Sequence, residues 1–554
     1  MPHQGPRRSS TAFSRSSLRD ETTKRFTLAN TKYPMPLPEN LANLRRTILE
    51  TLRVQREGPE TIPYIDVGHT LTDIAARQNH AVFGRRGCGK TLLLHHSAKE
   101  LPRDVRRVYI NCEDFKTHSF PNVLIEILDA VFKELDHKQI AWFGRKKRLK
   151  QLIAEMRGEL HGLHAQEDER EQSVRETFET ETSRSSKAEA AGTLKAQAAG
   201  FNASLGRLRL FKQRDAVERE YKQHDSKAKQ LNALLSPLKD KIREFFTLSN
   251  EVQAVFVEID DFYHLRRVDQ PHVMDYVHRL CKDLPLYFKV ATLRHASVLY
   301  ADRQGQPTGA QARHDYQPID VDFTLENIAK TERQFHEILY EFGRLSGVSH
   351  DEIDGLFKGD GFRRLVLAGG GVPRDCLSLF LEVLDSVSTR DGRIGKDDVR
   401  FLSLETFERR IEELKSDCEA REQDALLAGI YVIRNFCMEK KQSAFLVSEQ
   451  LLRDNGDIRE LLYRLLDYRI IHQVASALTH KHRSGTYRAF VIDVGCYAFM
   501  RKLKGRFTEI DLWERTAREK LRSVPVIGIQ DFAEQAEAIP EDVEMALKTE
   551  PEVP

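Results

Sequence analysis

The sequence predicts an α/β fold built around a parallel β-sheet. Apolar runs typical of buried strands occur at 81–83, 107–112, 254–261 and 287–293, with a weaker one at 319–325. Segments with one apolar helical face lie between them, as at 91–94 and 123–135. Because strands that alternate with helices form doubly wound parallel sheets, we expect a ligand to bind at the carboxyl ends of these strands.

A glycine-rich loop joins the first strand to the helix after it. Residues 84–91 are Gly-Arg-Arg-Gly-Cys-Gly-Lys-Thr, a complete Walker A motif. The glycines let backbone N–H groups converge on phosphate oxygens, and the helix N-terminus adds the positive end of its dipole. We expect Lys90 to reach the β- and γ-phosphates and Thr91 to ligate Mg²⁺, which makes ATP and Mg²⁺ the predicted cofactors. The candidate nucleotide contacts are Gly84, Arg85, Arg86, Gly87, Cys88, Gly89, Lys90, Thr91 and Leu92.

The apolar run at 254–261 ends in two carboxylates, Asp260 and Asp261. This pattern is typical of a buried parallel strand that presents its acids at the sheet edge. We expect Asp260 to hold Mg²⁺ through water and Asp261 to orient the attacking water as a general base. Glu258 interrupts the run, which predicts that one side of this strand is partly exposed. A core strand that ends in two solvated acids is the alternative.

Composition excludes several other classes of protein. A chain of 554 residues predicts two or three domains, and a net charge of +2 gives no global field that favours nucleic acid. Seven scattered cysteines without a Cys-x-x-Cys pair argue against a disulfide framework or structural zinc, and favour a reducing cytoplasm. No apolar run approaches the roughly 18 residues of a membrane-spanning helix, so we expect a cytoplasmic protein with no membrane partner.

The domain organisation follows from changes in pattern along the chain. Residues 1–35 suggest a disordered basic arm, and 36–136 with 250–325 form the expected P-loop core, in which 62–68 would lie against the nucleotide base. The segment 137–249 exceeds what two βα units need. It carries charged helical arms with apolar residues at heptad-like spacing: Leu149, Leu152, Ile153 and Met156. We expect a helical hairpin or coiled coil that projects from the core, with a disordered insertion as the alternative.

The C-terminal part is mainly helical. Residues 326–415 predict a lid, in which Gly-Gly-Gly-Val-Pro-Arg at 369–374 opens a helix. From 424 to 505 we expect helices at 426–436, 446–452 and 458–468 and strands at 470–476 and 487–492, the order of a winged helix. A basic turn at 480–483 and the basic clusters at 145–148 and 207–214 can contact DNA, although protein contact, lid extension or simple solvation are open alternatives. The extension 506–554 ends in an acidic tail that we expect to be solvated.

Taken together, these motifs resemble the AAA+ ATPases of the origin-recognition (ORC-CDC-like) initiator clade. That resemblance implies a P-loop core, a helical lid and a winged helix, with Thr292 or Arg294 as sensor one and Arg374, after Pro373, as sensor two. It makes Lys90, Asp261, Arg294 and Arg374 the catalytic candidates. Two departures are the long insertion and Asp261, where that clade usually has glutamate. Arg303 and Arg313 are arginine-finger candidates without a supporting motif.

The same residues also resemble the NB-ARC/STAND signalling switches. In that family an arginine that ends strand four (compare Arg294) and a Gly-x-Pro motif (compare 371–373) hold the nucleotide, and the winged helix acts as a clamp. ABC-type coiled-coil ATPases are a poor match, because the only signature-like segment, at 345–348, follows the acidic strand rather than precedes it.

Two functions follow from these resemblances. One is an Mg²⁺-dependent ATPase that couples nucleotide state to DNA binding or to assembly with partners, by analogy in a bacterial defence or mobile-element system. The other is a slowly hydrolysing regulatory switch that acts through protein–protein assembly. Either is compatible with a homo-oligomer or with a partner protein.

Overall fold

The computed structural model describes residues 37–52, 64–66, 68–136, 143–165, 226–249, 251–303, 306–388, 392–418, 420–498, 507–540 and 542–548. The expected basic arm at 1–35, the basic cluster at 207–214 and the middle of the insertion lie outside these residues.

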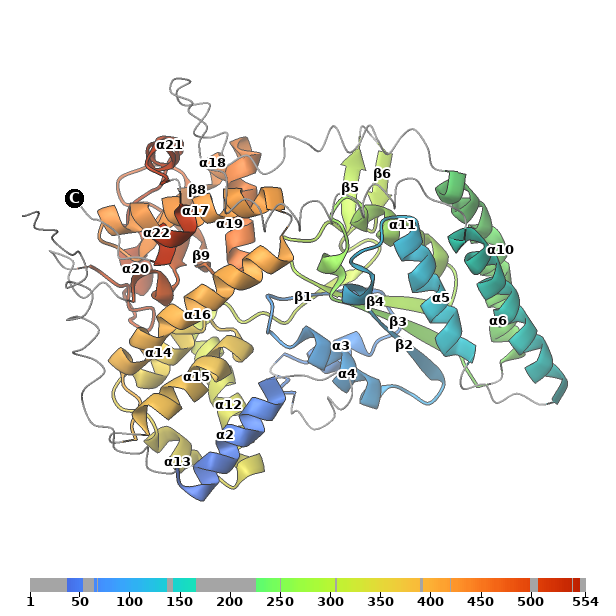
Figure 1. Ribbon diagram of the computed structural model, residues 1–554, viewed down its shortest axis with the longest axis horizontal. Helices are drawn as coiled ribbons and strands as arrows, with labels where there is room; N and C mark the ends of the chain where they lie inside the picture. Colours follow the sequence, from blue (N-terminus) through green and yellow to red (C-terminus); the bar gives the residue numbers. More distant parts are fainter. Residues whose placement is uncertain are drawn as a thin grey trace, which may run out of the picture.

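A five-stranded parallel sheet forms the sheet core (Figure 1), which confirms the predicted fold class. The strands stand in the order β2-β3-β4-β1-β7. Their bounds are β1 (His80–Phe83), β2 (Val105–Asn111), β3 (Ala254–Asp260), β4 (Leu286–Thr292) and β7 (Gln317–Asp320). Register places Phe83 level with Thr292 and Asp320, and Asn111 level with Asp260. The carboxyl ends of all five strands therefore meet at one edge, where the P-loop begins.

Helices cover both faces of the sheet. Along β1, Val82 packs with Leu93 and Leu94 on one face, whereas Ala81 and Phe83 belong to the apolar cluster on the other. The first face carries α3 (Thr70–Ile74) and α4 (Lys90–Glu100). The second carries α5 (Asn122–Asp136), α6 (Phe143–His164), α10 (Ser226–Leu248) and α11 (Gln270–Cys281). Short 3-10 turns follow β2 and β3: η2 (Cys112–Phe115) and η4 (Phe262–His264).

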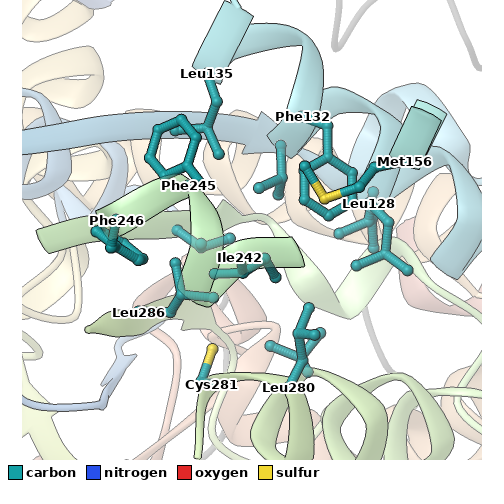
Figure 2. Close-up of a pocket in the computed structure, with 14 residues that line it drawn as sticks. Leu128, Phe132, Leu135, Met156, Ile242, Phe245, Phe246, Leu280, Cys281 and Leu286 are labelled. Atoms are coloured by element: carbon teal, nitrogen blue, oxygen red, sulfur yellow. The ribbon is translucent and has the colours of Figure 1, made fainter. Parts of the chain in front are cut away.

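The described part of the insertion extends this core instead of projecting from it. The apolar residues at heptad-like spacing on α6 are all buried and belong to one cluster with α5, α11 and the sheet. Figure 2 shows the junction, where Phe132 of α5, Met156 of α6 and Ile242 of α10 surround an apolar pocket with Leu280 and Cys281 of α11. The apolar stripe of α6 meets the stripe of α5, so it is covered by the core as well as by α10.

Strand β3 is buried at every position, so the expected exposure at Glu258 is wrong. Its carboxylate lies 2.5 Å from the Arg107 guanidinium on β2, and Lys289 of β4 stands beside it in register. Burial raises the pKa of Glu258 to about 7. A charged residue is tolerated inside the sheet because cations from two neighbouring strands flank it, which no local pattern reveals.

A small hairpin leaves the sheet between β4 and β7. It consists of β5 (Tyr300–Arg303) and β6 (Gln306–Gly309), and it packs on α11. Arg303 ends β5, and Arg313 lies in the turn that leads to β7 with a φ of 67°.

The lid region follows the sheet core, with the bounds η5 (Leu325–Asn327), α12 (Ile328–Ser346), α13 (His350–Gly355), α14 (Gly361–Ala368), α15 (Pro373–Val387) and α16 (Lys396–Asp417). The helix α2 (Glu39–Leu52), which precedes the P-loop in sequence, packs on α12 and α15 rather than on the sheet. Leu44 and Ile48 are its buried residues. The lid region therefore receives one helix from the beginning of the described chain.

The C-terminal module comprises α17 (Ala420–Glu439), β8 (Ala444–Ser448), α18 (Glu449–Asp454), α19 (Gly456–Asp467), β9 (Ile471–Thr479), β10 (Thr486–Ile492) and η6 (Val494–Tyr497). Its antiparallel sheet has the order β8-β10-β9. The helix expected at 446–452 is wrong in its first half, because 444–448 form β8 and α18 begins at Glu449. Short apolar runs do not distinguish a strand from a buried helix segment.

The acidic tail is structured as far as residue 548, contrary to expectation. Main-chain hydrogen bonds join the extension to β8, from Leu446 N–H to Pro525 O at 2.8 Å and from Ile527 N–H to Leu446 O at 2.9 Å. In the described part of the extension, the short helix α20 (Ala517–Leu521) precedes this segment, and α21 (Ile529–Glu537) and α22 (Val543–Lys548) follow it. Phe532 and Leu547 are fully buried, because the acids lie on the outer faces of amphipathic helices.

One apolar cluster runs through α2, the lid region, the C-terminal module and the extension, which together we call the C-terminal half. The sheet core has a separate cluster. Figure 1 shows the two halves side by side, with the P-loop edge of the sheet turned toward the C-terminal half.

Candidate functional site

The P-loop has the backbone geometry that its glycines permit. Gly87 and Gly89 have φ values of 86° and 89°, and Gly89 is the N-cap of α4. The Lys90 ammonium is buried and donates hydrogen bonds to the carbonyls of Gly84 at 2.9 Å and Arg85 at 3.2 Å. Its long side chain therefore curls back along the loop.

The acid at the end of β3 lies beside this loop. Asp260 is fully buried and accepts hydrogen bonds from the Tyr109 hydroxyl at 2.8 Å and from the Asp261 N–H at 2.9 Å. The Thr91 hydroxyl also bonds to it. Burial, reinforced by the nearby Asp261 charge, raises the pKa of Asp260 to about 6. The structure thus brings together Lys90, Thr91 and Asp260, which are distant in sequence.

Tyr109 is a site residue that the sequence does not reveal. It lies on β2, and only the register between β2 and β3 brings its hydroxyl to Asp260. An aromatic residue inside an apolar strand is otherwise an ordinary core residue.

The oxygen chemistry of this corner suits Mg²⁺. This ion prefers hard oxygen ligands and keeps several waters while it shares phosphate oxygens with its protein ligands. The Thr91 hydroxyl and the Asp260 carboxylate supply such oxygens. Within the part of the chain that the structure describes, no group of three or more His, Cys, Asp or Glu side chains can hold a metal. The corner therefore fits an ion shared with phosphates rather than one enclosed by protein.

Asp261 begins the turn after β3 in a left-handed conformation, with a φ of 49°. It is only partly buried, in contrast to Asp260. The backbone therefore turns away from the sheet between the two acids, and their carboxylates meet different surroundings.

The two sensor-one candidates sit at the same sheet edge as the P-loop. Thr292 is fully buried, its carbonyl accepts from the Gly84 N–H at 3.4 Å, and its hydroxyl shares a hydrogen bond of 2.5 Å with Ser297. Arg294 forms an ion pair with Asp320 at the end of β7, and its guanidinium lies 4.6 Å from the Phe83 ring centroid. Both residues are thus near the loop, but the Arg294 charge is held by Asp320.

The sensor-two element packs directly on the P-loop. Pro373 starts α15, and the Arg374 N–H donates to the Gly87 carbonyl at 3.3 Å. A Cβ atom at Gly87 would lie 2.8 Å from the Arg374 Cβ and 3.1 Å from Val372. Only glycine allows this approach. The Arg374 side chain itself is exposed.

The side chains of Arg85 and Arg86 are both paired with acids outside the loop. Arg85 is buried, lies 2.8 Å from the Asp322 carboxylate and donates to the Gly370 carbonyl of the lid region at 2.8 Å. Cys88 donates to the same Asp322 at 3.2 Å. Arg86 forms an ion pair with Asp417 at the end of α16. Both arginines thus link the loop to its surroundings.

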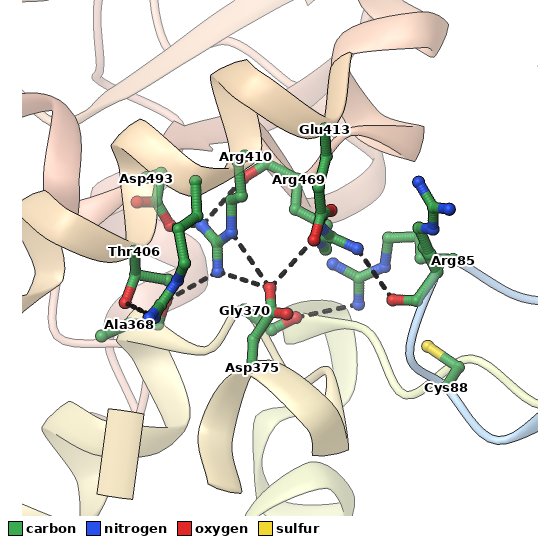
Figure 3. Close-up of polar contacts among 12 residues, drawn as sticks. Arg85, Cys88, Ala368, Gly370, Asp375, Thr406, Arg410, Glu413, Arg469 and Asp493 are labelled. Carbon is green, nitrogen blue, oxygen red and sulfur yellow. Dashed lines mark hydrogen bonds and ion pairs between the residues drawn. The ribbon is translucent and has the colours of Figure 1, made fainter. Parts of the chain in front are cut away.

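A buried polar network continues from these arginines into the C-terminal half (Figure 3). Arg410 of α16 lies 2.9 Å from Asp375 and forms a second ion pair with Asp493. Arg469 shares Asp375 at 3.0 Å. His472 accepts from Arg85 at 3.3 Å and bonds to Asp493 at 3.1 Å. The sequence does not reveal this network, because its members are polar residues scattered along the chain from the P-loop to the end of β10.

The helix expected to read DNA, α19, instead faces the sheet core. Tyr463 stacks on His295 with ring centroids 4.4 Å apart, and Glu460 lies 2.5 Å from Arg267. Arg464 is buried against Glu422 of α17. Most of the polar side chains of this helix are thus committed within the molecule. By contrast, Lys481, His482 and Arg483 of the basic turn at 480–483 are exposed.

Tyr64 belongs to the segment expected beside the nucleotide base, of which the structure describes residues 64–66 and 68. Its ring lies 3.9 Å from the position of a Cβ at Gly89, and its hydroxyl bonds to Thr70 at 2.8 Å. An aromatic ring therefore borders the start of α4.

The sheet, the glycine loop and the acid of β3 define a P-loop α/β protein. No protein-family model matches the chain, and no curated protein matches it. Among solved structures, a Walker-type ATPase of Pyrococcus abyssi aligns with 14% identity and a TM-score of 0.33, over 82% of this chain and 93% of that one. At this TM-score the likeness carries no argument. In the described part of the chain, no helix is both long and apolar enough for a membrane span.

Proposed function

We propose that this chain is an Mg²⁺-dependent ATPase that works as a nucleotide-controlled switch, in which the C-terminal half closes on the P-loop. One observation carries the proposal. The loop that holds the phosphate-binding elements is also contacted by the lid region and by the C-terminal module. The P-loop would bind phosphates on its concave side and contacts the C-terminal half on its outer side. Phosphate binding and docking of the C-terminal half are therefore coupled through the loop.

The residue roles follow from the geometry. Lys90 leaves the carbonyls of Gly84 and Arg85 and pairs with the phosphates. Thr91 and Asp260 would hold Mg²⁺, which when bound neutralises charge on the phosphate oxygens. Asp261, partly buried at the turn after β3, is the candidate base for water. Its shorter side chain, compared with glutamate, favours slow hydrolysis, which suits a switch more than a motor.

The buried position of α19 supports the STAND-like alternative over DNA reading by that helix. In the closed arrangement, a duplex cannot reach a helix whose aromatic and acidic side chains contact His295 and Arg267. The C-terminal module then acts as a clamp on the sheet core, and its output is assembly with another protein or with further copies of the chain.

Hydrolysis and hydrogen exchange test this proposal together. We expect slow Mg²⁺-dependent ATP turnover that Lys90→Ala abolishes and that Lys99→Ala, at the other end of α4, leaves unchanged. We also expect ATP and ADP to give different amide exchange in α19 and in the 294–298 loop. Equal exchange in these segments with ATP, with ADP and without nucleotide would refute the switch.

A second candidate is an ATPase of the initiator type that binds DNA. It is supported by the exposed turn with Lys481 and Arg483 and by the exposed basic residues at 145–147 on α6. It predicts salt-dependent binding of duplex DNA that weakens when Lys481 and Arg483 are both replaced by alanine. An absence of binding at low salt in either nucleotide state would rule it out.

A further inference from the structure

Arg469 combines three unusual features in the turn between α19 and β9. Its φ is 62°, a left-handed conformation that costs a residue with a side chain about 1 kcal/mol or more and that glycine adopts freely. Its guanidinium is almost fully buried. It also contacts the P-loop from the C-terminal module, on the other half of the molecule. The conformation itself ends α19 in the usual way, because the Arg469 N–H donates to the Leu466 carbonyl and the Ile470 N–H to the Leu465 carbonyl, each at 3.0 Å. Glycine is the residue that most often takes this position, so an arginine here is notable for what its side chain contacts.

The contact is with the backbone of the Walker A motif. The Arg469 Nη1 donates to the Arg86 carbonyl at 2.8 Å. On its other side the guanidinium is held by Asp375 at 3.0 Å and by an ion pair with Glu413. The two carboxylates come from α15 and α16 of the lid region (Figure 3). The lid region therefore holds the guanidinium in place, and the guanidinium in turn holds the Arg86 carbonyl of the P-loop.

The Arg86 carbonyl is one of four successive anchored carbonyls. Lys90 holds those of Gly84 and Arg85, and the Arg374 N–H holds that of Gly87. The carbonyl of Arg86 and the N–H of Gly87 belong to one planar trans peptide, so they point in opposite directions. Anchoring the carbonyl outward therefore aims the Gly87 N–H inward, at the concave side of the loop where phosphate oxygens bind.

We propose that Arg469 is a positioning residue of the nucleotide site: through the Arg86 carbonyl it presets the Gly87 N–H for the phosphates, so that docking of the C-terminal module strengthens nucleotide binding. This inference rests on the proposed nucleotide function. It adds the residue through which the C-terminal half controls nucleotide binding at the P-loop. Arg410 shares Asp375 with Arg469, but it donates to the carbonyls of Ala368 and Arg469 instead of to the loop.

The test measures release of a fluorescent ATP analogue from the full chain with Mg²⁺. Arg469→Gly removes the side chain and relieves the backbone strain at the same time. We expect it to fold, with about tenfold faster release, because a hydrogen bond to a charged group is lost. Arg469→Lys keeps one charged donor and is expected to fall between the glycine variant and the wild type. Arg464→Ala, which removes a buried arginine of α19 from its partner Glu422, is the matched control and should release nucleotide at the wild-type rate.

The outcomes separate the two proposals. No binding by the wild type, or binding that survives Lys90→Ala, overturns the nucleotide function and this inference with it. Lys90-dependent binding with wild-type release from Arg469→Gly overturns only the role of Arg469, as does equally fast release from Arg464→Ala. If the glycine variant does not fold, wild-type release from Arg469→Lys still overturns the inference, and faster release supports it.

Discussion

The carboxylate of Asp467, the last residue of α19, accepts a hydrogen bond of 2.7 Å from the backbone N–H of Ala296, just beyond the end of β4. It accepts another of 3.0 Å from the His295 N–H. The C-terminal module therefore contacts the sheet core at the strand that also ends beside the P-loop, and Asp467 is buried in that contact. The attachments here and at Arg86 both hold the module against the sheet core.

Replacing Asp467 with alanine should loosen this attachment. Two backbone N–H groups would lose their acceptor inside the interface, which we expect to cost about 1–3 kcal/mol of stability. The measurement is amide exchange at 294–298 together with thermal unfolding. Asp454→Ala, at an exposed position at the end of α18, is the control and should change neither. Unchanged exchange at 294–298 in the Asp467 variant would show that the hydrogen bonds do not hold the interface.

Mg²⁺-dependent nucleotide binding should weaken as the pH falls below about 6. Burial raises the pKa of Asp260 to about 6. Because the folded pKa is above the unfolded one, protonation of this group favours folding at low pH, and its contribution is lost as the pH rises through 6. Mg²⁺ instead needs the ionised carboxylate, so binding and stability change in opposite directions. Mg²⁺ titrations of nucleotide binding on both sides of this pH test the expectation.

Asp260→Asn is the matching substitution for that titration. The amide keeps the shape of the side chain but removes the charge, so the variant should lose Mg²⁺ dependence and its pH response, with binding at least about tenfold weaker. Asp275→Asn, which removes a surface ion pair with Arg279 on α11, should behave as wild type. Retained Mg²⁺ dependence in Asp260→Asn would place the ion elsewhere.

Gly87→Ala should uncouple the lid region from the P-loop. The new methyl group would meet Arg374 and Val372 at 2.8 and 3.1 Å, at a φ of 86° that alanine disfavours. We expect loss of nucleotide binding with a folded sheet core. Gly158→Ala on α6 has no atom within 4 Å of its added carbon and should stabilise the chain by roughly 0.5–1 kcal/mol. Nucleotide affinity and thermal unfolding of both variants distinguish a local effect from a global one.

The structured tail makes a plain prediction about stability. Phe532→Ala should cost about 3–5 kcal/mol, because the ring of α21 is fully buried against the C-terminal module. Met545→Ala on α22 removes a side chain that is 60% exposed and should change stability by less than about 0.5 kcal/mol. Denaturant unfolding measures both. If the two variants are similarly stable, the tail does not pack on the C-terminal module, and the solvated tail that the acidic composition suggests is correct.

Local patterns predict the sheet core well. The Walker A loop, the first four strands and the helices after the first and second strands follow from apolar runs, and each run predicts its own burial. The weaker run at 319–325 is displaced, since β7 ends at Asp320. Glu258 is misjudged because the cations that make its burial possible, Arg107 and Lys289, come from other strands.

The errors in the C-terminal half have a different cause. The run at 444–447 has no period that separates strand from helix, so only pairing with β10 identifies β8. Similarly, the buried positions of Arg469 and Arg410 depend on carboxylates more than twenty residues away in sequence. Burial of each of these charged side chains without its partners would be unfavourable, so no pattern in a single segment predicts the network.

The most direct test is calorimetric titration of the full chain with ATP in the presence of Mg²⁺. Our interpretation predicts saturable binding of one nucleotide per chain, weakened strongly by Lys90→Ala and by omission of Mg²⁺, and unaffected by Lys99→Ala. If the wild type gives no heat of binding, or if Lys90→Ala binds as tightly as the wild type, the proximity of Lys90, Thr91 and Asp260 does not form a nucleotide site.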